Sequence, residues 1–147
     1  MSIPQTHAFN TPYQLSKLPA KVVAQMALFG GGKPLHDLPK DAQLYHHEVK
    51  HGDVLVFATD GVWDNLSSQD ILRIVSRLMI AFGAWADAES GLEVSRGLHR
   101  LTQSGGIGRS ENNTLQALLA LAITKEAKEA SLNQRRDGPF AKAVQKE

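Results

Sequence analysis

The sequence predicts an α+β protein, with strands in its first 60 residues and helices after them. A continuous apolar run covers Val54–Ala58, which is typical of a strand buried on both faces. A helix-capping pattern begins at Ser67, and apolar residues recur at helical spacing from Thr114 to Ala130. At 147 residues the chain is long enough for one domain with a buried core.

The first predicted strand is Gln5–Asn10, followed by a turn at Thr11-Pro12-Tyr13. The turn is expected because proline fixes its own φ and restricts the preceding residue to extended geometry. Glycines and prolines interrupt Leu18–Lys40, so this range is predicted to be mostly irregular.

Two further strands are predicted to pair as a hairpin. Leu44–Val49 mixes polar and apolar residues, whereas Val54–Ala58 is apolar throughout. Lys50-His51-Gly52-Asp53 lies between them and has the composition of a connecting turn.

The remaining elements are predicted to be helices. Ser67 and Asp70 form a capping box at the start of the first one. A second helix is expected over Leu92–Leu101 and a third from Thr114 to Ala130. Asp137-Gly138-Pro139 then breaks the chain before a short final helix.

Charge and composition exclude several classes of protein. Sixteen basic and fifteen acidic residues leave a net charge of +1, which gives no electrostatic footprint for nucleic acid. No apolar stretch approaches the length that spans a bilayer, so no membrane span is predicted. The chain has no cysteine, which excludes disulfides, thiolate metal sites and a cysteine nucleophile.

The stretch that carries chemistry joins the apolar strand to the capped helix. Asp60 follows the strand directly, and Gly61 allows a tight turn after it. A carboxylate fixed at the end of a rigid strand suits hard cations such as Mg²⁺ and Mn²⁺, which prefer oxygen ligands. The alternative is a plain Asp-Gly turn that connects the strand to the helix.

At these residues the sequence resembles the metal-dependent protein phosphatases of type 2C. Ala58-Thr59-Asp60-Gly61-Val62-Trp63-Asp64-Asn65 matches the late signature of that family position by position. Thr6–Leu15 and Leu115–Lys146 resemble segments of its mitochondrial branch. The resemblance covers most of the chain and corresponds to the later half of the family's catalytic domain.

The resemblance implies a β-sandwich with helices packed outside and a two-metal centre at one end. It implies that Asp60 is a ligand of Mg²⁺ or Mn²⁺, and that metal-activated water attacks the phosphorus of phosphoserine or phosphothreonine. The implied substrate is a phosphoprotein, and the implied location is the mitochondrion. The chain itself shows no targeting signal, since no apolar segment follows Met1 and the first arginine is Arg73.

Three parts of the family pattern are missing from the sequence. They are the early acidic Asp-Gly motif, the early phosphate-binding arginine and the closing acidic pair. We therefore expect residues 1–147 to be a partial type 2C domain with an incomplete sandwich. The alternative is a non-catalytic fragment or partner-binding module of the same ancestry, in which exposed strand edges pair with another chain.

Other interpretations concern residues in or near this stretch. Haloacid-dehalogenase-type hydrolases need a nucleophilic aspartate where this chain has Ala58, which excludes them. Trp63 either packs under the helix or forms a substrate platform, with packing favoured. Asp64 either orients the metal site or forms a turn. His46 and His47 would point to opposite faces of a strand and so could not share a metal.

Overall fold

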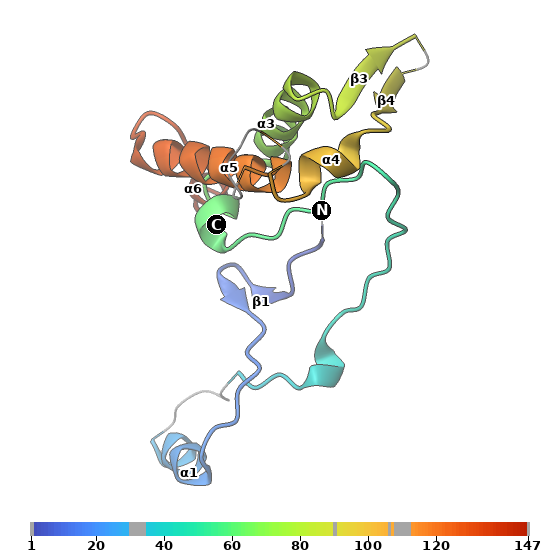
Figure 1. Cartoon of the computed structure of the whole chain (residues 1–147). Helices are drawn as coiled ribbons and strands as arrows, with labels where there is room; N and C mark the ends of the chain where they lie inside the picture. The colour runs from blue at the N-terminus through green and yellow to red at the C-terminus, as the bar shows by residue number, and fades with distance from the viewer. Residues whose placement is uncertain (1, 30–34, 90, 106, 108–112, 147) are drawn as a thin grey trace. The chain divides into compact units, whose positions relative to one another are not determined.

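The computed structural model describes residues 2–29, 35–89, 91–105, 107 and 113–146 (Figure 1). The chain divides into two compact units, Met1–Glu48 and Val49–Glu147, and each is described by itself. Helices and short antiparallel strands occur together, which confirms the predicted α+β class. None of the helices in the described ranges has the length and apolarity needed to cross a membrane.

The first unit opens with a small hairpin in which β1 (Thr6–Ala8) pairs with β2 (Thr11–Pro12). The predicted strand Gln5–Asn10 is confirmed at its centre. The turn lies earlier than predicted, because Asn10 adopts a φ of 48° that asparagine tolerates. Pro12 can then lie in a strand, since edge strands accept proline.

The prediction that Leu18–Lys40 is irregular is wrong for its first half. Helix α1 (Ala20–Leu28) forms there, because its sequence AKVVAQMAL lacks glycine and proline and is rich in good helix formers. Residues 30–34 lie outside the described part of the chain. The short 3-10 helix η1 (Pro39–Asp41) follows, and the Asp41 carboxylate accepts a hydrogen bond from the Leu38 N–H at 2.8 Å.

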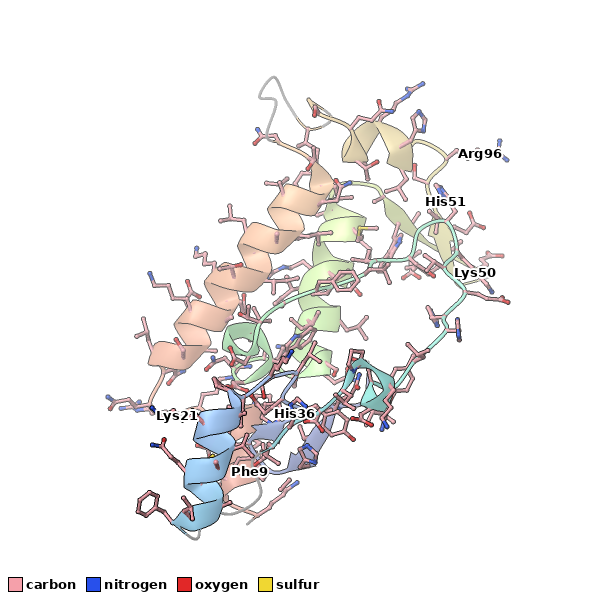
Figure 2. All side chains as sticks on the ribbon, turned by 90° about the horizontal axis from the view of Figure 1, so that it is seen from below. Phe9, Lys21, His36, Lys50, His51 and Arg96 are labelled. Atoms are coloured by element: carbon pink, nitrogen blue, oxygen red, sulfur yellow. The ribbon has the colours of Figure 1, made fainter. Side chains whose placement is uncertain are left out.

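Polar contacts hold the first unit together, since none of its described residues is fully buried. The Asp37 carboxylate accepts hydrogen bonds from His7 Nε2 at 3.0 Å and from the Gln14 N–H at 2.5 Å. These bonds hold the pKa of Asp37 below its ordinary value, with the His7 contact as the larger cause. Figure 2 labels three exposed side chains of this unit, Phe9, Lys21 and His36.

The predicted hairpin of Leu44–Val49 and Val54–Ala58 is wrong: neither range belongs to a strand. The turn between them does form, because the Asp53 N–H donates to the Lys50 carbonyl at 3.0 Å. The Asp53 carboxylate also accepts from the Lys50 N–H at 2.8 Å. A strand needs a neighbour to pair with, and neither segment has one among the described residues.

Helix α3 (Ser68–Ala81) confirms the predicted cap. Ser67 Oγ accepts from the Asp70 N–H at 3.2 Å, and the Asp70 carboxylate accepts from the Ser67 N–H at 2.9 Å. At the other end Gly83 takes a φ of 66°, and the Ala84 N–H donates to the Met79 carbonyl at 2.8 Å. This left-handed glycine ends the helix as in a Schellman motif.

A second hairpin follows, in which β3 (Trp85–Ala88) pairs with β4 (Gly91–Val94). The predicted helix over Leu92–Leu101 is therefore wrong in its first half, and α4 covers only Leu98–Thr102. Trp85 Nε1 donates to the carbonyl of buried Gly52 at 3.1 Å, so contacts with a distant turn favour the hairpin over the local helical pattern.

The core of the second unit lies between α3 and α5 (Leu115–Leu132). Helix α5 confirms the predicted helix and runs two residues beyond Ala130. Helix α6 (Pro139–Val144) confirms the short final helix. The buried apolar residues come mainly from α3 and α5: Leu66, Ile71, Ile74, Val75, Met79, Ala84, Leu115, Leu119, Ile123, Ala127 and Ala130.

The described strands form two separate two-stranded sheets. They do not make the partial β-sandwich that was expected. The apolar segment Val54–Ala58 lies against helices and lacks a strand on either side among the described residues.

Candidate functional site

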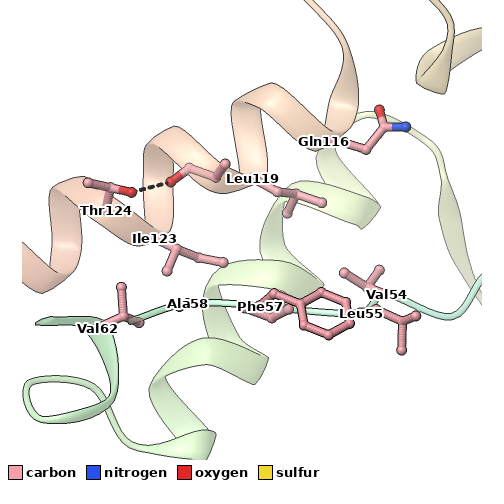
Figure 3. Close-up of a pocket in the computed structure, with 11 residues that line it drawn as sticks. Val54, Leu55, Phe57, Ala58, Val62, Gln116, Leu119, Ile123 and Thr124 are labelled. Carbon is pink, nitrogen blue, oxygen red and sulfur yellow. Dashed lines mark hydrogen bonds between the residues drawn. The ribbon is translucent and has the colours of Figure 1, made fainter. Parts of the chain in front are cut away.

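The segment that leads to Asp60 lines a pocket together with residues of α5 (Figure 3). Val54 and Val56 are partly buried against the core that includes α5. Leu55 and Phe57, which alternate with them along the chain, are 58% and 91% exposed. Side chains that alternate in this way are typical of a β-strand, although no ladder is formed here.

Asp60 is the first residue of α2 (Asp60–Trp63), a single helical turn. Thr59 before it is extended, and the turn closes where the Asp64 N–H donates to the Asp60 carbonyl at 2.7 Å. Trp63 Nε1 donates to the Ala58 carbonyl at 2.9 Å, and the ring packs against the core. These contacts agree with the packing interpretation of Trp63.

The two carboxylates of this turn differ in environment. Asp60 is exposed, whereas Asp64 is partly buried. Burial raises the pKa of Asp64 above its ordinary value, and the nearby negative charge of Asp60 raises it further. The turn therefore leaves the Asp60 side chain in solvent and partly buries the Asp64 side chain.

The exposed carboxylate of Asp60 has the oxygen atoms that a hard cation prefers. One carboxylate, however, supplies too few ligands to hold such a cation. Within the described ranges, no three His, Asp or Glu side chains come together in a way that could hold a metal. His46 and His47 are both exposed, and neither belongs to the strand that was predicted for them. These residues do not by themselves fit a two-metal centre.

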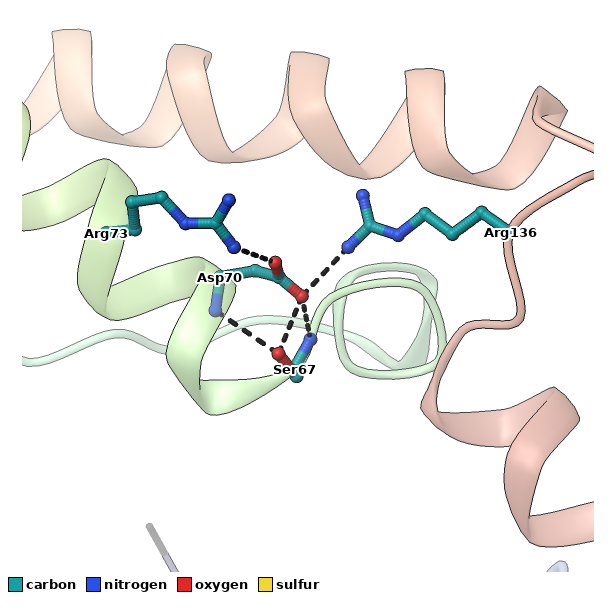
Figure 4. A network of polar contacts seen from close by, with 4 residues as sticks. All are labelled: Ser67, Asp70, Arg73 and Arg136. Carbon is teal, nitrogen blue, oxygen red and sulfur yellow. Dashed lines mark hydrogen bonds and ion pairs between the residues drawn. The ribbon is translucent and has the colours of Figure 1, made fainter.

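A polar network stands next to the Asp60 turn (Figure 4). Asp70 accepts hydrogen bonds from Ser67 Oγ at 2.6 Å, from Arg73 Nη2 at 2.5 Å and from Arg136 Nη2 at 2.8 Å. These contacts lower the pKa of Asp70, and the Ser67 hydroxyl has the largest effect. The sequence indicates the Ser67–Asp70 cap, but nothing in it points to Arg136.

Comparison with known proteins finds several curated relatives. The chain is 42% identical over 67 residues to "Protein phosphatase 2C homolog 7, mitochondrial" of Saccharomyces cerevisiae, covering 46% of this chain and 19% of that protein. It is 30% identical over 140 residues to "Protein phosphatase PTC7 homolog fig" of Drosophila yakuba, covering 95% of this chain and 32% of that protein. It is 36% identical over 74 residues to "Protein phosphatase PTC7 homolog" of Danio rerio, covering 50% of this chain and 22% of that protein.

These matches show that the chain is related to the type 2C protein phosphatases. The chain spans a third or less of the length of these three relatives. No protein-family profile matches it, and no solved structure matches it.

Proposed function

We propose that the chain is part of a protein serine/threonine phosphatase of type 2C, and that Asp60 is one ligand of its Mg²⁺ or Mn²⁺. The single observation that carries this proposal is Asp60 itself: an exposed carboxylate on a fixed turn, inside a stretch that matches the family signature. The relationship to curated type 2C phosphatases supports it.

The proposal extends to the domain and its fold. Residues 1–147 would be part of one type 2C catalytic domain, and Val54–Ala58 would be one strand of its sandwich. The alternating exposure of this segment, and the lack of a strand paired with it among the described residues, support a strand whose neighbours come from elsewhere in such a domain. The remaining metal ligands would come from other strands in the same way.

The names of the relatives support a proposal for the substrate and the location. A protein phosphatase acts on phosphoproteins, so we propose phosphoserine or phosphothreonine in a protein as the substrate. The Saccharomyces cerevisiae relative is named as mitochondrial, which supports a mitochondrial location for this chain.

The test is hydrolysis of a phosphothreonine peptide by the chain, with millimolar Mn²⁺ and with a chelator. We expect little or no turnover, because the described residues offer no complete ligand set, and any turnover should need the metal. Asp60→Asn should abolish it, while Asp87→Asn, which removes an exposed carboxylate from β3, should not. Equal turnover in Asp60→Asn and the unmodified chain would contradict the proposal.

The alternative, a partner-binding module, is favoured by one observation. Leu55 and Phe57 are exposed beside a backbone that has no strand partner among the described residues. If the same segment of a second copy paired with it in antiparallel fashion, with Val56 opposite Val56, Leu55 of each copy would lie opposite Phe57 of the other. The occupant we propose for this edge is therefore a second copy of the chain.

Light scattering after size-exclusion chromatography tests this second candidate. We expect a dimer whose population grows with concentration and disappears in Phe57→Lys, because a charged side chain on a strand edge opposes pairing. Leu132→Lys, at a 73% exposed position on α5, is the matched control and should leave the dimer intact. A monomer at every concentration would exclude self-pairing.

A further inference from the structure

The end of the chain lies directly against the turn that carries Asp60. The Phe140 N–H donates to the Asp64 carbonyl at 3.2 Å, and the Asp64 N–H donates to the Asp60 carbonyl at 2.7 Å. A hydrogen-bonded path of two steps thus connects the C-terminal segment to Asp60. Asp64 is the residue that the two steps share.

Gly138 also brings the C-terminal segment close to this turn, because its backbone packs tightly against Asp64 and Asn65. A Cβ atom added there would lie 2.5 Å from the Asp64 carbonyl oxygen and 3.2 Å from Asn65 Cα. The φ of Gly138 is −70°, which any residue adopts, so space rather than backbone conformation calls for glycine here. The neighbours are backbone atoms, which cannot move aside as a flexible side chain can.

Arg136 supplies a second contact between the C-terminal segment and this region, at the start of α3. Its guanidinium contacts the Asp70 carboxylate, which caps the first turn of α3. Leu66, between α2 and α3, is 1% exposed and is fixed in the core. The C-terminal segment therefore holds the end of α2 and the start of α3 together.

We propose that residues 136–140 form a C-terminal clasp that positions the Asp60 turn, with Arg136 and Gly138 as positioning residues. The clasp acts through the backbone of Asp64 and the cap of α3, and touches no reacting group. A role of the clasp in catalysis rests on the proposed function of Asp60. The effect of the clasp on the structure of the turn does not rest on it, so either proposal can fail without the other.

Amide hydrogen exchange of the full chain tests the clasp at the N–H groups of Asp64, Asn65 and Leu66, which donate within the turn. We expect Gly138→Val to speed their exchange about tenfold or more, while buried residues of α5 exchange as before. Arg136→Gln should give a smaller change in the same amides, and Arg136→Lys should restore part of the protection. The Arg136 variants keep the test valid if Gly138→Val fails to fold.

Matched controls separate positioning from general loss of stability. Gly97→Ala adds a Cβ that fits, 3.5 Å from Ser95 Oγ, and Arg135→Gln removes an exposed neighbouring charge. Val75→Ala weakens the core on α3 and should not single out the turn. The clasp is wrong if Arg136→Gln leaves the turn amides as protected as Arg135→Gln does. Exchange needs no turnover, so a failed phosphatase assay would leave this result standing.

Discussion

The guanidinium of Arg136 lies 2.8 Å from the carboxylate of Asp70, although 66 positions separate the two residues in the chain. The Asp70 side chain is 18% exposed and that of Arg136 is 34% exposed, so the pair is partly shielded from solvent. Because Asp70 also accepts from Ser67, the contact ties the chain end to the beginning of α3.

Removing the cap of α3 should destabilise the second unit. Ser67→Ala removes the hydroxyl that accepts from the Asp70 N–H, and losing such a cap costs about 1 kcal/mol. Urea unfolding followed by tryptophan emission measures this, since both tryptophans lie in the second unit. Ser104→Ala, at an exposed position, should unfold like the unmodified chain. Identical midpoints for the two variants would contradict the capping role.

The contribution of Asp70 should depend on pH. Its folded pKa lies below the ordinary value of 3.8, so its carboxylate stabilises the fold above that pH. This stability is lost as the pH falls from about 3.8 through the folded pKa. We expect the difference in unfolding free energy between the unmodified chain and Asp70→Asn to be constant near neutral pH and to shrink below about pH 4. A difference that stays constant down to pH 2 would exclude this linkage.

The packing of α5 on the core should be sensitive at Ile123. Its side chain is 6% exposed, and truncation to alanine leaves a cavity that costs about 2–5 kcal/mol. Leu121→Ala, at a 66% exposed position on the same helix, should cost far less. Chemical unfolding of both variants measures the loss in unfolding free energy. Similar losses in the two variants would show that the buried face of α5 is assigned wrongly.

Gly52 should resist substitution for two reasons. Its φ is 95°, and an added Cβ would overlap the methyl groups of Val94 on β4. We expect Gly52→Ala to shift the emission of Trp85, whose indole donates to the Gly52 carbonyl, and to cost more than the roughly 1–2 kcal/mol of left-handed strain.

Gly105→Ala is the matched control for Gly52. Its φ is 76°, but nothing lies within 4 Å of an added Cβ, so it carries the strain without the overlap. Equal losses of stability in the two variants would mean that Val94 does not lie over Gly52.

The sequence was enough to predict the elements that depend on residues close together in the chain. Ser67 and Asp70 are three residues apart, so the cap of α3 could be predicted and is confirmed. The periodic apolar residues of α5 and the break before Pro139 are local in the same sense, and both helices are confirmed. The relationship to type 2C phosphatases was likewise evident from one short run around Asp60.

The tertiary structure decided everything that needs a distant partner. Val54–Ala58 has the composition of a buried strand, yet a ladder requires a second strand and none of the described residues supplies one. Trp85 and Val94 meet Gly52 and make a hairpin where the local pattern predicted a helix. The sequence by itself determined helix caps, helical faces and the family signature, because these depend on residues within a few positions. Only the folded chain could place Arg136 on Asp70 and Gly138 on Asp64, because contacts between distant segments leave no local pattern.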